Sequence, residues 1–301
     1  MTLITASLYL LCLAFLFGSA VFVYSRDPRS RLNGYYALLA LALLGWVGTL
    51  FVFNGLAEGN SLLLVGRTNF AFAAIAVTAC YFFVAELAGL RTRLAPLLWI
   101  ETLALAIVSA VTTLIDRTET IQAGQHFTVY GPLFAAYILH VAAYLAGAII
   151  IAFRHHDRLP DRTGSQLRLV GAGTLATAVI AVTTNILLPY AFGDFRFIHV
   201  GTLSTILLLA AVGYAVFAYR LFDIRIILRT TLVLAVLVSL ALEVYQASVA
   251  ALAELLPLGD PAQRHLAAVT VALVVNASTG GALRSWLERI ADRLIDRKKR
   301  Q

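Results

Sequence analysis

Long apolar segments, separated by short polar stretches, make up most of this 301-residue chain. A run of roughly 20 apolar residues is long enough to cross the hydrocarbon core of a bilayer as a helix. Barrel strands would be about half as long and would alternate apolar with polar residues, so the pattern predicts helices. Nine apolar segments can be marked, at residues 3–24, 35–56, 62–88, 96–115, 132–153, 167–188, 198–219, 230–256 and 266–283.

The ninth segment is the weakest, because Asn276, Ser278 and Thr279 fall in its inner half beside two glycines. A helix lying in the membrane interface is the alternative there. We therefore predict an all-α fold, a polytopic membrane helical bundle with a seven-helix core and about two further helices.

The composition supports a membrane protein, with 60% hydrophobic and 13% charged residues and a mean hydropathy of +0.86. Soluble domains have roughly 25% charged residues. A soluble enzyme, a disulfide-rich secreted module and a disordered regulator are all excluded. Cys12 and Cys80 lie within apolar segments, so we expect buried thiols rather than a disulfide.

The basic residues are distributed unequally between alternate loops. Nineteen of the 23 arginines and lysines lie on one side of the predicted spans, and four, Arg67, Arg117, Arg196 and Arg264, lie on the other. The positive-inside rule places the first side in the cytoplasm of a bacterial plasma membrane, with the N-terminus outside and the C-terminus inside. This distribution is typical of membrane topology, so no nucleic-acid partner is expected.

Several short motifs, each weak alone, together resemble one family over residues 1–222. They are Arg67-Thr68-Asn69-Phe70, Tyr130-Gly131-Pro132-Leu133, Gln166-Leu167-Arg168, Thr184-Asn185-Ile186-Leu187-Leu188-Pro189 and the run from Tyr214 to Arg225. The pattern resembles the seven-helix N-terminal membrane region of bacterial sensor histidine kinases. The resemblance implies a sensor-like domain at 1–222 followed by two additional helices at 223–283, and the pattern of the tail predicts a short basic amphipathic cytoplasmic helix at 284–301.

The resemblance also implies signal reception, with the output passed to a cytoplasmic catalytic module. No phosphoacceptor-histidine helix, asparagine box or ATP lid is found in the sequence, so the chain is not expected to be an enzyme. A kinase or cyclase module acting in trans, or one lost by truncation, would receive the signal. A small-molecule transporter or channel subunit is the alternative function.

Three polar residues near helix ends are candidates for the signal-sensing site. Arg67 is expected to meet an acid on its own side, such as Glu58, Asp116, Glu119 or Asp194, and to shape an outer ligand pocket. Asn69 and Asn185 are buried amides, which either hold helices together or contact a ligand, and Asn185 with Pro189 is a candidate for shaping the outer mouth. Aromatic residues within 117–137 and 190–219 either line a pocket for an apolar or peptide ligand or form an interfacial belt.

Two further candidates lie in the eighth segment. Glu243 is near its middle, and Gln246 follows three residues later on the same helical face. Placing an acidic side chain at the centre of a membrane helix costs at least about 2.5 kcal/mol, so a residue of this kind is expected to have a structural or functional role. It either changes protonation or partner on signalling, or makes a static interhelical hydrogen bond. Phe222, Asp223 and Arg225 are expected to relay helix movement towards the cytoplasm.

Other ionisable residues are expected to be structural. Glu86 and Glu101 should pair with Arg91 and Arg93 near the cytoplasmic ends of their helices, and His140 should be a buried hydrogen-bonding residue. The histidines outside the spans share no ligand spacing, so no metal or cofactor is predicted.

The tail carries apolar residues at helical spacing, Leu283, Leu287, Ile290 and Leu294. This stripe predicts either a homodimer through the C-terminal helix or an amphipathic helix lying on membrane lipid.

Overall fold

The computed structural model describes residues 3–55, 60–122 and 125–218, together with 244, 247, 270 and 271. The chain divides into two compact units, 1–224 and 225–301, and the architecture below is that of the first. Glu243 and Gln246, the relay residues Phe222, Asp223 and Arg225, the two additional helices and the tail helix all lie outside the described residues.

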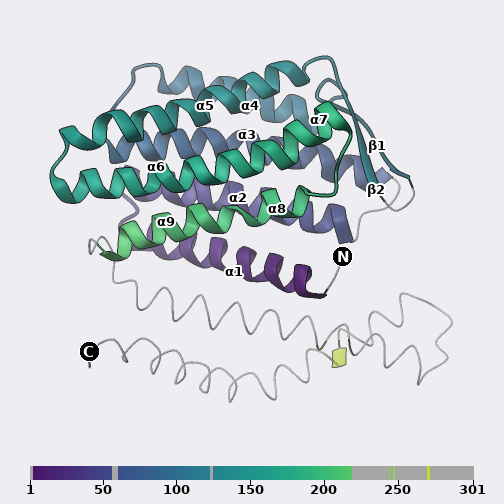
Figure 1. Cartoon of the computed structure of the whole chain (residues 1–301), viewed down its shortest axis with the longest axis horizontal. Coiled ribbons are helices and arrows are strands. Elements are labelled where there is room, and N and C mark those ends of the chain that lie inside the picture. Colours follow the sequence, from purple (N-terminus) through teal and green to yellow (C-terminus); the bar gives the residue numbers. More distant parts are fainter. Residues whose placement is uncertain are drawn as a thin grey trace. The chain divides into compact units, whose positions relative to one another are not determined.

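Helices run back and forth through the first unit (Figure 1). The elements are α1 (Leu3–Arg26), α2 (Arg31–Gly55), α3 (Asn60–Leu87), α4 (Ala95–Val111), β1 (Asp116–Gln122), β2 (Gln125–Tyr130), α5 (Phe134–His155), η1 (His156–Arg158), α6 (Asp161–Val182), η2 (Thr183–Leu187), α7 (Leu188–Phe192), α8 (Ile198–Leu203) and α9 (Thr205–Ala218).

These elements confirm the predicted all-α bundle. The first five predicted segments correspond to α1 through α5, the sixth to the run α6–η2–α7, and the seventh to α8 and α9. Five of these runs are long and apolar enough to span a bilayer, and Ala95–Val111 and Ile198–Val212 are shorter apolar helices. Large apolar side chains on α4 are exposed, as lipid-facing residues would be: Leu97, Ile100, Leu103, Ile107 and Val111.

Local sequence explains where several helices begin and end. α3 is followed by Gly89, whose φ of 71° suits glycine at a helix C-terminus. α4 has Pro96 in its first turn, where a missing backbone N–H is harmless. α7 is followed by Gly193 at φ 63°. These signals explain why the observed bounds fall within a few residues of the predicted ones.

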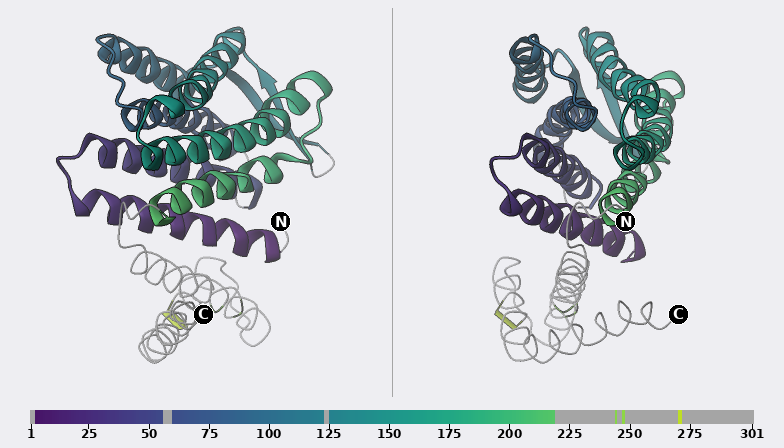
Figure 2. Two further views of the ribbon diagram at one scale, coloured as in Figure 1. Left: turned by 60° about the vertical axis from the view of Figure 1, so that its left-hand side comes forward. Right: turned by 90° about the vertical axis from the view of Figure 1, so that its left-hand side faces the viewer.

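The interior is closely packed around α3. This helix contacts α2, α4, α5 and α6, while α9 packs mainly against α6 and α1 against α2 (Figure 2). Many residues in the main buried cluster are small, such as Ala40, Ala79 and Ala152, which lets helices approach closely. Cys12 and Cys80 are buried free thiols, as predicted.

One connection differs from the prediction. The prediction contains helices and no strand, but the connection between α4 and α5 contains an antiparallel hairpin in which Gln122 pairs with Gln125 and Thr120 with Phe127. The two strands contain threonine, isoleucine, valine and aromatic residues, which favour extended structure. We call this side of the bundle the hairpin end and the opposite side, where α1 ends and α6 begins, the arginine-rich end.

Candidate functional site

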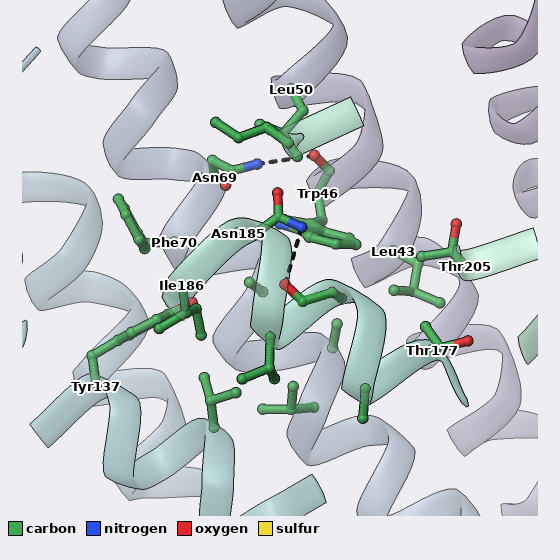
Figure 3. Close-up of a pocket in the computed structure, with 18 of the residues that line it drawn as sticks. Leu43, Trp46, Leu50, Asn69, Phe70, Tyr137, Thr177, Asn185, Ile186 and Thr205 are labelled. Carbon is green, nitrogen blue, oxygen red and sulfur yellow. Dashed lines mark hydrogen bonds between the residues drawn. The ribbon is translucent and has the colours of Figure 1, made fainter. Parts of the chain in front are cut away.

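A cavity of about 150 Å³ lies inside the bundle towards the hairpin end. Its walls come from α2, α3, α5, α6, η2, α7, α8, α9 and both strands, and most of the lining is apolar. Trp46, Phe70 and Ile186 are typical of this lining (Figure 3). Three of the aromatic residues in the ranges predicted as pocket candidates, Tyr130, Tyr137 and Phe195, also line it.

Asn69 lines the cavity from α3 with its amide orientation fixed. Its Nδ2 donates to the Trp46 backbone oxygen at 3.0 Å and to the Thr49 hydroxyl at 2.9 Å. A backbone carbonyl can only accept, so the nitrogen must face α2. The Asn69 amide oxygen is therefore left facing the cavity, as Figure 3 shows.

Asn185 lines the cavity from η2, a π-turn inserted between α6 and α7. Pro189 has no N–H to offer the Asn185 carbonyl, and its ring would clash there in a regular helix. The chain widens instead, and the Leu188 N–H bonds to the Thr183 oxygen five residues back. Such π-turns often occur at functional sites.

The π-turn also fixes the Asn185 side chain. Its Nδ2 donates to the Ala181 oxygen at 3.2 Å and to the Thr184 hydroxyl at 3.3 Å. The amides of Asn185 and Asn69 point towards one another from opposite walls (Figure 3). The sequence thus identified two amides that share one cavity, although it did not show that both present their oxygens to it.

Two carboxyl groups on β1 lie at the hairpin end of this site. Asp116 and Glu119 both lie against Gly66, where an added Cβ would be 2.9 Å from Glu119 Oε1 and 3.0 Å from Asp116 Oδ2. Glu119 lines the cavity and accepts a hydrogen bond from the Thr128 hydroxyl at 2.9 Å. Asp116 is fully buried, and neither of its carboxylate oxygens has a hydrogen-bond partner in the described part of the chain.

Burial sets the charge state of this pair. It raises the pKa of Asp116, while Arg67 opposes the rise. It also raises the pKa of Glu119, and the nearby Asp116 charge raises the pKa of Glu119 further. A proton held by Glu119 and donated to Asp116 would satisfy the otherwise unpartnered carboxylate.

Arg67 lies beside these acids, but it binds the backbone. Its Nε donates to the Asp116 carbonyl oxygen at 3.1 Å and its Nη2 to the Arg117 carbonyl oxygen at 3.4 Å. Asp194 pairs with Arg196 at 2.7 Å instead, and Glu58 lies outside the described residues. Arg67 therefore attaches the hairpin to α3, and it does not itself line the cavity.

A second polar cluster lies between α3, α4 and α5. His140 Nδ1 is 2.8 Å from Glu101, and His140 Nε2 is 3.2 Å from the Ala74 oxygen. The Tyr144 hydroxyl donates to Glu101 at 3.0 Å, and the Thr78 hydroxyl is 2.9 Å from that of Thr102. The prediction of a buried, hydrogen-bonding His140 is confirmed.

The prediction that Glu101 pairs with Arg91 or Arg93 was wrong. Glu101 faces His140 and Tyr144 instead, because it lies on the face of α4 that meets α5. Glu86 does pair with Arg91, at 3.6 Å. The spacing of His140 and Tyr144, four residues apart within an apolar helix, was the available signal for this cluster.

Comparison with known families agrees with this architecture. Residues 8–225 match the family described as the N-terminal 7TM region of histidine kinase. No curated protein matches the chain. The match includes the whole cavity, the hairpin and the motifs on which the predicted resemblance rests. With its long apolar helices the chain is a multi-pass membrane protein, and it belongs to the family of N-terminal seven-transmembrane regions of histidine kinases.

Proposed function

We propose that this chain is a receptor in which a small molecule enters from the outer face of the plasma membrane and occupies the cavity. Its occupancy shifts the equilibrium between two packings of the bundle. A cytoplasmic kinase or cyclase module, acting in trans or on a longer form of the chain, reads the shift. The family membership supports a membrane sensor region, and the cavity supplies a place for the ligand.

The main support for this proposal is that α9 connects the cavity to the arginine-rich end. Thr205 and Leu208 of α9 line the cavity. The same helix continues to Ala218, at the arginine-rich end, just before the predicted relay residues. A molecule in the cavity therefore touches the helix that leads to the output. Only the difference in its affinity for the two packings is transmitted.

The distribution of charge supports the proposed orientation. In the described part of the chain, Arg26, Arg31, Arg93, Arg158 and Arg162 lie in the connections and helix ends opposite the hairpin. The hairpin end carries Arg67, Arg117 and Arg196. The positive-inside rule then places the arginine-rich end in the cytoplasm and the cavity near the outer surface.

Filling the cavity with a side chain tests the proposal without a known ligand. Ala181→Phe places a ring among the lining residues, and Ala104→Phe places the same ring on the exposed face of α4 as a matched control. Spin labels at positions 93 and 162, both exposed at the arginine-rich end, report the separation of α4 from α6. The remaining cysteines are buried and should not label.

We expect Ala181→Phe to change the 93–162 distance distribution in lipid nanodiscs and Ala104→Phe to leave it as in the parent. A monodisperse elution profile for both proteins shows that each is folded. Identical distributions in the parent and in folded Ala181→Phe would refute the idea that cavity occupancy drives the output. Substrate flux through liposomes containing the protein would instead favour the transporter alternative.

A further inference from the structure

The polar groups that line the cavity are mainly hydrogen-bond acceptors. Asn69 and Asn185 have both committed their N–H groups to the protein, and within the described ranges no group donates to their amide oxygens. The lining hydroxyls donate to protein oxygens as well: Thr128 to Glu119, Thr174 to Val170, Thr177 to Ser204 and Thr205 to Thr202. A ligand must therefore bring donors of its own.

Three lining groups keep a donor whose partner is not a described residue. They are the indole N–H of Trp46 and the phenol groups of Tyr130 and Tyr137. The phenols can also accept, and all three rings present electron-rich faces that attract cations. The cavity lining as a whole therefore still favours a ligand that carries hydrogen-bond donors.

The ionisable carboxyl groups at the cavity are acidic, and Arg67, the cation beside them, does not line the cavity. No arginine, lysine or histidine is among the lining residues, whereas Glu119 lines the cavity and the fully buried Asp116 lies behind it. Neither carboxylate oxygen of Asp116 has a hydrogen-bond partner in the described part of the chain, and a buried acid pair is stabilised by protons or by nearby cations such as Arg67. A negatively charged ligand would meet these acids and several lone pairs with no described cation on the cavity wall, whereas an ammonium group would take the place of the proton that Glu119 holds in the empty cavity.

The size of the cavity limits the apolar part of the ligand. A volume of about 150 Å³ is comparable to that of engineered protein cavities that bind benzene. One ring or a short branched chain would fill it, with Trp46, Phe70 and Ile186 as neighbours.

We propose that the cavity binds a small apolar molecule that carries a protonated amine, with its N–H groups on the oxygens of Asn69, Asn185 and Glu119. This inference rests on the proposed receptor function and names its ligand class. The ring contributes hydrophobic contact, and the amine contributes recognition. A small carboxylic acid of the same shape should be rejected.

A set of probes with one shape and different heads tests this. Benzylamine supplies a cation with three donors, benzyl alcohol a single neutral donor, toluene no polar group and benzoate an anion. The reporter is 5-fluorotryptophan at position 46, in full-length protein carrying Trp99→Phe and Trp286→Phe, observed by ¹⁹F NMR in nanodiscs. Because Trp46 lines the cavity, a saturable shift reports binding there rather than partition into lipid.

We expect benzylamine to bind roughly tenfold more tightly than toluene, since a hydrogen bond to a charged group contributes about 1.5 kcal/mol or more. Benzoate should not bind measurably. Asn69→Leu and Glu119→Gln should each reduce the preference for the amine while toluene still binds. Asp157→Asn, which changes an exposed acid outside the cavity, should leave the preference unchanged.

The outcomes separate the two proposals. Equal binding of benzylamine and toluene, or binding of benzoate, would overturn the amine inference and leave a receptor for apolar ligands standing. Retention of the amine preference in both Asn69→Leu and Glu119→Gln would also overturn it. If none of the four probes shifts the Trp46 signal, the cavity is not a ligand site and both proposals fail.

Discussion

Gly201 in α8 provides a sharp test of the packing around the π-turn. A Cβ at this position would collide with Asn185 Nδ2 and Thr184 Oγ1. Both atoms belong to η2, so a single methyl group would push directly on one wall of the cavity. Gly201→Ala is therefore expected to destabilise the bundle and to displace Asn185.

The magnitude follows from the contacts that must change. Overpacking a closely packed interior costs roughly 1–3 kcal/mol. Moving Asn185 away from the Ala181 oxygen loses a hydrogen bond with a net value of about 1 kcal/mol. Alanine recovers up to about 1 kcal/mol over glycine within a helix. The expected net loss for Gly201→Ala is roughly 1–3 kcal/mol.

Gly34→Ala is the matched control, because nothing lies within 4 Å of a Cβ at that position in α2. It should be neutral or stabilising by up to about 1 kcal/mol. The free energy of unfolding can be measured by SDS titration in mixed micelles, with benzylamine binding measured on the same preparations. If Gly201→Ala is as stable as Gly34→Ala, the close contact between α8 and η2 is refuted.

Four further outcomes are expected. Burial raises the pKa of Glu119, so the folded state holds a proton that the unfolded state releases at about pH 4.3. Stability should therefore fall as the pH rises from that value towards the raised pKa, and thermal unfolding of Glu119→Gln should show a weaker pH dependence. Arg67→Ala removes two bonds to the hairpin, so amide exchange in the strands should become faster, whereas Arg196→Ala should not affect it. Glu101→Ala leaves His140 without its carboxylate partner and should cost about 1–3 kcal/mol of stability in the SDS titration. Finally, a cysteine at position 158 should resist an impermeant thiol reagent in intact cells; labelling from outside would reverse the proposed orientation.

The helical part of the fold was predictable because lipid leaves few alternatives. Backbone groups inside a bilayer must bond within their own segment, so apolar length translates directly into helices. The hairpin was missed because residues 116–131 are polar and short, and strand pairing depends on tertiary context. Its threonine-rich alternation and the small residues Ala123 and Gly124 between the strands were the available signals.

The candidate site was predictable in composition but not in geometry. Asn69 and Asn185 could be selected as rare amides in apolar helices. They share a cavity because α3 lies opposite η2. No local pattern in the sequence indicates this tertiary arrangement. For the same reason Glu101 was assigned to the wrong partner, because the rotation of α4 decides which neighbour it meets.

The attachment of the hairpin by Arg67 has a consequence for how such receptors diversify. Among the described residues, Arg67 donates only to main-chain oxygens, which every amino acid carries. Evolution can therefore exchange Glu119 or Thr128 for other residues without undocking the strands. A membrane sensor region built this way can change the residues around its cavity through one or two codon changes while its scaffold stays intact.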